Sequence, residues 1–364
     1  MSRLERQAVW NLDWILLTTT VLIAIIGIMS IYSATYLTSH RHFVERQSLY
    51  IIIGIMIAAG IVIVDYRRIL PYQSLLFWFS IGLLLYLEIK GGVGGKVDRY
   101  LKIWILPTIT PSEFLKFALI LRVAHHFRGR QLADVKVRDF LSPIAGFFVG
   151  LGLILKQPDL GTALLLVPVF IAQIFIAGYD YKKILGIIIL GSLVGFFTAQ
   201  SVLKPYQYER LVGFTRQGEN SQETGWQLRQ SKVAIGSGGF WGRGYLNGTQ
   251  AKLEFLPAKH TDFILAVFAE EWGFIGIFGL FSLYIVWLWR GLKIARMASG
   301  ASGLLAVTGV CTLFALQFII NAGMIVGLLP ITGITLPFMS YGGSSILTNM
   351  ICLGVVLSVG VCRT

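Results

Sequence analysis

The sequence is poor in charged residues and in cysteine. Only 13% of its 364 residues are Asp, Glu, Lys or Arg, whereas soluble domains carry about 25%. The three cysteines, Cys311, Cys352 and Cys362, form no CxxC pair, and no histidine stands near them at metal-ligand spacing. The first shortage argues against a soluble domain. The second gives no sign of a cysteine-based metal site, and we interpret the cysteines as small core residues.

Apolar residues are abundant instead. They make up 55% of the chain, and the mean hydropathy is +0.72. Apolar runs of about 17–25 residues recur, which is long enough to cross a hydrocarbon core of about 30 Å. The sequence therefore predicts an integral membrane protein. The net charge of +13 is assigned to loops that face anionic lipid, and no nucleic acid partner is expected.

The apolar runs predict an all-α, polytopic membrane protein with ten transmembrane helices in one domain, residues 1–364. The first run, 15–31, is too long for the apolar region of a signal peptide and is expected to stay as an anchor. Runs 72–89 and 110–127 are the weakest because they contain or end on charges. The ten expected spans are 13–35, 48–65, 72–89, 110–127, 139–156, 159–178, 184–203, 262–290, 303–328 and 338–361.

Lys and Arg in the short loops predict the orientation. With the N-terminus inside, the cytoplasmic loops hold about twice as many of these residues as the outer loops. Both termini are then cytoplasmic, and a large loop at about 204–261, between the seventh and eighth helices, lies outside. Nucleotides are scarce there, so an enzyme would need a substrate that carries its own activation, such as a lipid-linked phosphate sugar.

The passage 226–273 is the only long polar and glycine-rich stretch. It offers hydrogen-bonding side chains such as Gln230 and Ser231 and cations such as Arg243 and Lys259. Its glycines at 236, 238, 239, 242 and 244 lack the frame of a phosphate-binding loop. Glycine-rich turns are the plainer interpretation, although exposed backbone N–H groups in such turns can also hold an anion.

Asp262, in FLPAKHTDF, follows this passage where apolar sequence resumes. Thr261 is expected to cap the eighth helix, with Asp262 in its first turn, and a carboxylate there is ordinary because it favours the helix dipole. The functional alternative is that the dipole and Lys259 keep Asp262 ionised, so that it accepts a proton from an alcohol. His260 is a second candidate for that role.

Three further charges stand at the outer ends of apolar runs. Glu113 and Lys116 are spaced i, i+3 and can pair on one helix face. Charges at membrane depth usually face a cavity or a partner, so the pair is structural, catalytic or both. Asp159, in KQPDLGTALL, opens a helix after a tight hairpin, and it is a candidate site wall or metal ligand.

The passage 328–349 contains Pro330, Gly333 and Pro337 and then the small polar helix start MSYGGSS, which includes Ser340. Small residues allow helices to pack closely. The alternative is an uncovered helix N-terminus that faces an anionic headgroup.

Five motifs, in order and over essentially the whole chain, resemble the SEDS family (shape, elongation, division and sporulation) of membrane peptidoglycan polymerases. They are KQPDLGTALL, RQSKVAIGSGGFWGRG, GTQ, FLPAKHTDFILAVFAEE and PFMSYGGSS. AIGSGGFWGRGYLNGTQ and the short N-terminus resemble the RodA elongation branch more than the FtsW division branch. Departures from the family pattern include Thr110 before Pro-Ser-Glu, Ala258 and Trp272.

The resemblance implies ten transmembrane helices with a large outer loop and polymerisation of lipid II into glycan strands. It makes the Asp of the HTDF motif, here Asp262, essential. Glu113, Lys116, Asp159 and Arg46 also match family motifs. We expect inverting transfer, with Asp262 as general base on the acceptor hydroxyl. Arg210, Arg243, Lys259 or a divalent cation, Mg or Mn, would neutralise the leaving pyrophosphate, and no organic cofactor is expected.

Two other functions stay open. A lipid II flippase would use intramembrane charges such as Glu113, Lys116 and Arg122 and would depend less on Asp262. A purely structural anchor for a transpeptidase would need no acid. The resemblance implies a class B penicillin-binding protein as partner, together with lipid II and undecaprenyl-pyrophosphate-linked glycan. The expected place is the cytoplasmic membrane, with the active site facing outside.

Overall fold

The structure, a computed structural model, describes residues 11–36, 42–94, 110–132, 135–157, 159–186, 189, 222–249 and 260–362, and this part of the chain is helical without strands. The helices are α2 (Trp14–Thr35), α3 (His42–Val64), α4 (Tyr66–Ile69), η1 (Leu70–Tyr72), α5 (Gln73–Gly94), α6 (Pro111–His126), η3 (Val137–Phe140), α7 (Leu141–Lys156), α8 (Leu160–Ile176), α11 (Gln222–Gly238), α13 (Ile264–Arg296), α14 (Ala301–Val326) and α15 (Gly343–Val361).

Seven helical stretches among the described residues are long and apolar enough to cross a membrane, and α8 is a shorter apolar helix. Each expected span that falls on described residues has a helix at or near its predicted position, within a few residues at most ends. Most of the expected seventh span, 184–203, lies outside the described residues, so ten remains a prediction. The prediction of an all-helical, polytopic membrane protein is confirmed.

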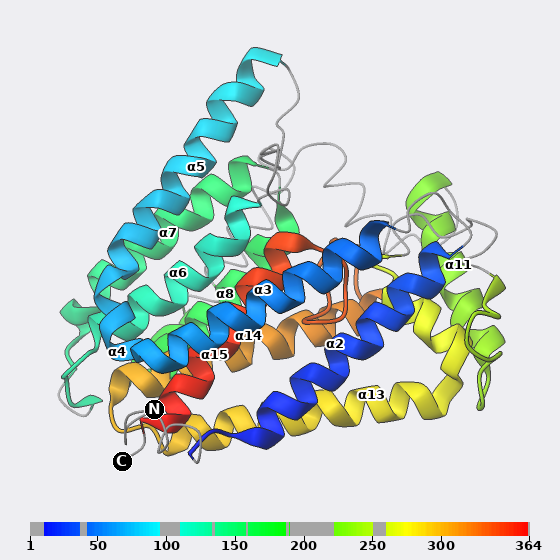
Figure 1. Cartoon of the computed structure of the whole chain (residues 1–364). Coiled ribbons are helices and arrows are strands. Elements are labelled where there is room, and N and C mark those ends of the chain that lie inside the picture. Colours follow the sequence, from blue (N-terminus) through cyan, green and yellow to red (C-terminus); the bar gives the residue numbers. More distant parts are fainter. Residues whose placement is uncertain are drawn as a thin grey trace.

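α14 and α15 form the centre of the bundle. Helices α5, α6 and α7 lie on one side of them, and α2 and α13 lie along the other (Figure 1). Small residues bring α15 close to α3, because a Cβ added at Gly354 would stand 2.9 Å from the Cα of Ala58. Dispersion contacts at such close approach are what holds helices together inside a bilayer. Cys311 and Cys352 are free and buried in this core, as predicted, whereas Cys362 is only half-buried, so the prediction that all three cysteines are core residues holds for two of them.

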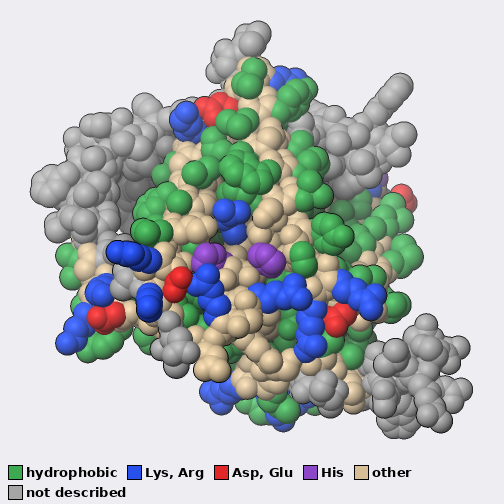
Figure 2. Space-filling model, turned by 90° about the vertical axis from the view of Figure 1, so that its left-hand side faces the viewer, with side chains coloured by type: hydrophobic (Ala, Val, Ile, Leu, Met, Phe, Trp, Pro, Cys, Tyr) green, Lys and Arg blue, Asp and Glu red, His purple; other side chains and the backbone are tan. Residues whose placement is uncertain are grey.

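One end of the bundle carries most of the described cations. Asp13 caps α2 by accepting from the N–H of Leu16, and it also pairs with Arg290 at 2.7 Å. Arg67 donates to the carbonyl oxygen of Cys362, so Asp13 and Cys362, which stand near the two ends of the described chain, both bond to cations at this end of the bundle. Figure 2 shows Lys and Arg side chains gathered on the face that is turned to the viewer. By the excess of cations, this end is the one predicted to be cytoplasmic.

Candidate functional site

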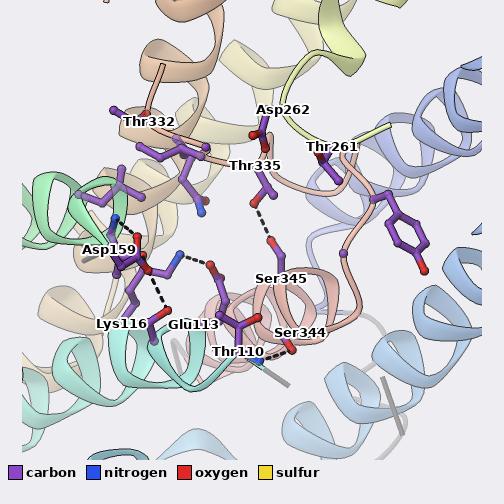
Figure 3. Close-up of a pocket in the computed structure, with 18 of the residues that line it drawn as sticks. Thr110, Glu113, Lys116, Asp159, Thr261, Asp262, Thr332, Thr335, Ser344 and Ser345 are labelled. Atoms are coloured by element: carbon purple, nitrogen blue, oxygen red, sulfur yellow. Dashed lines mark hydrogen bonds and ion pairs between the residues drawn. The ribbon is translucent and has the colours of Figure 1, made fainter. Parts of the chain in front are cut away.

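A cavity of about 530 Å³ lies at the opposite end of the bundle, where α6, α8 and α15 begin (Figure 3). Three helix N-termini therefore turn their positive dipole ends toward it. The cavity is mostly polar, unlike the rest of the core. Its walls are formed by Thr110, Ser112, Glu113, Lys116, Asp159, Thr162, Leu165, Gln227, His260, Thr261, Asp262, Phe263, Gln317, Ile331, Thr332, Gly333, Ile334, Thr335, Tyr341, Gly342, Gly343, Ser344 and Ser345.

Glu113 and Lys116 form the predicted pair on the first turns of α6. Lys116 Nζ lies 2.7 Å from Glu113 Oε1, and the lysine side chain is only 2% exposed. The N–H of Thr110, just before the helix, donates to Ser344 Oγ at 2.9 Å and so ties α6 to α15. A buried cation needs a partner, and Glu113 supplies it while the pair faces the cavity.

Asp159 caps α8 and joins it to α6. Its Oδ1 accepts from the N–H of Thr162 at 3.2 Å, and its Oδ2 accepts from the hydroxyls of Thr162 at 2.8 Å and Ser112 at 3.2 Å. An N-cap aspartate is a common helix start. Here the cap also presents a carboxylate to the cavity, as the sequence predicts.

Asp262 lies just before α13 rather than in its first turn. The helix begins at Ile264, with Phe263 as N-cap and without a side-chain cap, so the prediction that Thr261 caps this helix is wrong. The physical reason is that the backbone of 260–262 is held from outside the helix. Asn321 Nδ2 donates to the carbonyl of Asp262 at 3.0 Å, and Ser340 Oγ donates to that of Thr261 at 2.9 Å.

The Asp262 side chain is directed to the cavity, near the loop of Gly333, whose φ of 71° suits glycine. A Cβ added at Gly333 would stand 3.5 Å from Asp262 Oδ2. Figure 3 shows Asp262, Asp159, Lys116 and Glu113 around the same space. Segments that are far apart in the sequence therefore bring these four charges to one site.

His260 also reaches the cavity wall, where aromatic rings surround it. Its ring centroid lies 4.7 Å from that of Phe43 and 5.7 Å from that of Tyr341. Burial raises the pKa of the Tyr341 phenol, and the nearby Arg46 guanidinium opposes that shift. The neutral phenol is therefore the form present near neutral pH. Ring packing holds the His260 side chain at the rim, close to Asp262 in the chain.

The described part of the glycine-rich passage is not made of turns throughout, and three of its backbone N–H groups bond within the protein. Gly236 and Gly238 belong to α11, which packs on α13 and α14. The N–H groups of Gly242, Arg243 and Gly244 all donate to backbone carbonyls, the last two to Glu270 at 3.0 Å and Glu271 at 2.9 Å. The interpretation of this passage as glycine-rich turns therefore holds only after Gly238.

This turn, residues 239–244, provides hydrogen-bond partners for the backbone where α13 is broken. Gly273 has φ 62° and ψ −160°, so the helix is kinked there. The N–H of Phe274 donates to Gly239 at 3.0 Å and that of Ile275 to Phe240 at 3.3 Å. Backbone groups that a kink leaves without helical partners need others. We call residues 238–244 with 269–275 the glycine clamp.

Several predicted site residues do not line the cavity. Arg243 donates to Thr249 Oγ1 at 3.0 Å and lies 3.9 Å from the buried carboxylate of Glu270. Ser231 donates to the carbonyl of Ile325 at 2.9 Å. The other residues of this group are Gln230 and Ser340, which are buried, and Arg46, which is exposed on α3. Arg210 and Lys259 lie outside the described residues. None of the described five lines the cavity.

Sequence reasoning missed several wall residues. Gln317 lies in the middle of an apolar run, where a lone amide is the one signal that marks it. Thr332 and Thr335 come from the loop before α15, and Ser344 and Ser345 from its first turn. Ser344 and Ser345 belong to the MSYGGSS helix start. For that segment the sequence left two interpretations open: close helix packing, or a helix N-terminus that faces an anionic headgroup. Small hydroxyl side chains are too common in loops to be singled out from sequence.

Among the described residues, no group of three or more His, Cys, Asp or Glu side chains converges in a way that could hold a metal ion. Asp159 and Asp262 line the cavity as single carboxylates from different elements. Mg²⁺ is commonly held by one or two carboxylates together with substrate phosphates. The residues present fit that kind of site and do not form a cage made by the protein alone.

Comparison with known proteins places this chain in a family. Residues 10–364 match the FtsW/RodA/SpoVE family of cell cycle proteins. The chain is 35% identical to a probable peptidoglycan glycosyltransferase FtsW of Trichlorobacter lovleyi, over 95% of this chain and 92% of that one. It is 31% identical to the peptidoglycan glycosyltransferase RodA of Treponema pallidum, over 97% and 98%.

A chain in a solved peptidoglycan synthase complex that coordinates polymerisation and crosslinking has the same fold. The TM-score is 0.79 at 29% identity, over 96% of this chain and 97% of that one. The fold and the cavity define a polytopic membrane protein with a polar site at one end of its helices. The chain belongs to the FtsW/RodA/SpoVE family, which is the SEDS family that its motifs resemble.

Proposed function

We propose that this protein is a peptidoglycan glycosyltransferase that polymerises lipid II into glycan strands in the cavity at Asp262. The observation that carries the proposal is the cavity itself, which gathers Asp262, Asp159 and the Glu113–Lys116 pair at the end of the bundle away from the cations. The relatives named peptidoglycan glycosyltransferase support the reaction class.

The chemistry is a single displacement. The 4-hydroxyl oxygen of the acceptor sugar forms a bond to C1 of the donor sugar, while the bond from C1 to the undecaprenyl pyrophosphate breaks. An α-linked donor then gives a β-linked product. The Asp262 carboxylate takes the hydroxyl proton, a general-base step that contributes about 10²–10⁴-fold. The backbone bonds from Asn321 and Ser340 keep the base in place.

The leaving pyrophosphate needs positive charge. The N-termini of α6, α8 and α15 supply some of it at the cavity. Asp159 would help to hold a divalent cation, Mg or Mn, which would supply further charge neutralisation for the pyrophosphate. Arg210 and Lys259 remain candidates for the same role.

The cavity faces the outside of the cytoplasmic membrane in this proposal, and both termini are cytoplasmic. The support is the gathering of Arg67, Arg290 and other cations at the opposite end. We further propose that a class B penicillin-binding protein is the partner. A chain of similar fold that belongs to a complex for polymerisation and crosslinking supports it.

The cellular role that we propose is elongation, as in RodA. A division role is the second candidate, because the relative at 35% identity is named FtsW while the RodA relative is 31% identical. Complementation separates the two. Rescue of rod shape in cells depleted of their elongation polymerase supports elongation, and rescue of septation alone supports division.

The enzymatic proposal is tested with the purified chain, its transpeptidase partner, labelled lipid II and Mg²⁺ or Mn²⁺. Glycan strands from the wild type but not from folded Asp262→Asn support it. If neither protein makes strands, but lipid II is translocated across liposome membranes that contain either of them, the flippase function is supported instead. The matched control is Asp139→Asn, the same change in η3 at the opposite end of the bundle.

A further inference from the structure

Three polar side chains in the cavity wall lack hydrogen-bond partners within the described part of the chain. They are Glu113 through Oε2, Thr332 through Oγ1, and Gln317 through both Oε1 and Nε2. Buried polar atoms are nearly always paired in native proteins, because an unpaired one loses its hydration without compensation. Unpaired buried atoms also occur elsewhere in the described chain, on Gln73, His125, His126, Asn321 and Thr348, but only the three side chains above line the polar cavity, which a ligand could enter.

Gln317 is the clearest of the three. It is 1% exposed and lies in the apolar helix α14. It stands one turn before Asn321, and side chains four residues apart share a helix face. Asn321 uses its Nδ2 to hold the carbonyls of Asp262 and Ile334. Gln317 therefore lies on the same face of α14 as Asn321, which holds the backbone of Asp262. It is one helical turn deeper in the bundle.

A second buried glutamine shows how the chain treats such a residue when its role is structural. Gln173 in α8 is also 1% exposed. Its Nε2 donates to the carbonyls of Ile120 at 3.1 Å and Leu305 at 3.0 Å, and so it joins three helices. Gln317 makes no such bond among the described residues. The two residues are alike in type and burial and differ in whether their donors are used.

We propose that the Gln317 carboxamide binds an uncharged part of the substrate, a sugar hydroxyl together with a neighbouring oxygen of the same ring. A carboxamide carries a donor and an acceptor side by side, which matches two adjacent sugar groups. Glu113 Oε2 accepts from a further hydroxyl, and Thr332 can donate or accept. Gln317 thereby determines specificity for the sugar. This inference rests on the proposed function.

The charges at this depth favour a sugar over a phosphate. Glu113 is an anion whose unpaired oxygen would repel a phosphate, and Lys116, the nearby cation, is already bonded to Glu113 at 2.7 Å. Gln317 and Thr332 are neutral. A site built from neutral hydrogen-bonding groups and one carboxylate suits hydroxyl and amide groups, since both can donate to the carboxylate.

The test compares Gln317→Met with Gln173→Met in the full chain with its partner. Methionine keeps roughly the volume of glutamine and removes its hydrogen bonds. Three quantities are measured: the Tm without ligand, the increase in Tm on adding lipid II, and the KM and kcat of strand formation. We expect Gln317→Met to keep or raise the Tm, to lose most of the lipid II shift, and to raise KM about tenfold, the effect of about one or two lost hydrogen bonds.

Gln173→Met should show the reverse pattern, with a lowered Tm and a KM near that of the wild type. The inference is overturned if Gln317→Met keeps the lipid II shift and the KM of the wild type. It is equally overturned if the Tm falls as in Gln173→Met and activity falls only with the amount of folded protein. A wild type that makes no strands contradicts the proposed function, and the lipid II shift still decides whether Gln317 binds this ligand.

Discussion

At the scale of single residues, the cavity is a set of charges whose positions are fixed by bonds to the backbone and to each other. Asp159 is held by Thr162 and Ser112, and the segment of Asp262 by Asn321 and Ser340. Lys116 is held by Glu113. Bonds of this kind keep a reactive carboxylate in place before the substrate arrives, and preorganised charge is effective in catalysis because it does not have to rearrange.

The Glu113–Lys116 pair gives a first prediction. Glu113→Gln leaves the Lys116 ammonium buried with its charge uncompensated, and breaking a buried pair in this way costs about 3–5 kcal/mol. The double variant Glu113→Gln with Lys116→Met removes both charges and should recover much of that loss. Thermal unfolding in detergent measures both variants. A double variant no more stable than Glu113→Gln would contradict the account of the pair.

Asn321 gives a second prediction at this scale. Asn321→Leu leaves the carbonyls of Asp262 and Ile334 without their donor, at a cost of about 1–3 kcal/mol for each unpaired group. Strand formation should fall even though the Asp262 carboxylate is intact, since a small displacement of the base lowers the rate. The measurement is kcat per folded molecule, determined alongside the Tm. Full kcat in a folded Asn321→Leu protein would show that this anchor does not position Asp262.

At the scale of elements, the glycine clamp explains why a polar, glycine-rich passage packs against a transmembrane helix. α13 is broken at Gly273, and the turn after α11 supplies the backbone partners that the break removes. The approach is close, because a Cβ at Gly242 would stand 2.2 Å from the carbonyl oxygen of Glu271. α11 also contributes Gln227 to the cavity wall, so the clamp connects this helix to the site.

The clamp is tested by alanine substitution at two glycines. Gly242→Ala forces a side chain against backbone at a φ of 80°, and we expect a loss of at least about 1 kcal/mol. Gly236 lies in α11 with no atom within 4 Å of an added Cβ. Gly236→Ala should therefore be neutral or stabilise by up to about 1 kcal/mol. Equal Tm values for the two variants would contradict the clamp.

The sequence predicts the membrane helices well but not α11 or the glycine clamp, and the difference has physical reasons. Long apolar runs mark the membrane helices, and charges at their ends mark Glu113, Lys116, Asp159 and Asp262. α11 was missed because its glycines and polar residues hide the helical pattern. The clamp depends on backbone bonds between residues about thirty positions apart, such as Gly244 and Glu271. Gln317 could be seen as an exception in an apolar run, but only the fold shows that it faces a cavity.

At the scale of the whole molecule, the protein separates two ends of a helical bundle. Cations and the ends of the described chain gather at one, and the cavity lies at the other. A soluble protein has no need of this asymmetry, whereas a membrane protein acquires it from the preference of Lys and Arg for cytoplasmic loops. In the proposed orientation the cavity end faces outside, where lipid-linked substrates would meet while their tails remain in the bilayer.

The orientation is open to direct labelling. Arg68 is exposed in α4 at the cation-rich end, and Asn247 is exposed a few residues after the turn that follows α11. In intact cells, a membrane-impermeant maleimide should react with Asn247→Cys and not with Arg68→Cys, and permeabilised cells should show both. Cys362 is replaced by serine as background, because Cys311 and Cys352 are buried. The reverse labelling pattern would place the cavity in the cytoplasm and contradict the proposed site.

The measurement that tests the central claim most directly is the rate of glycan-strand formation from lipid II by Asp262→Asn. The amide keeps the shape of the carboxylate and cannot take the proton of the acceptor hydroxyl. The account predicts a rate about 10²–10⁴-fold below the wild type, with an unchanged Tm and with Asp139→Asn at the rate of the wild type. Strand formation by folded Asp262→Asn at the rate of the wild type would contradict it.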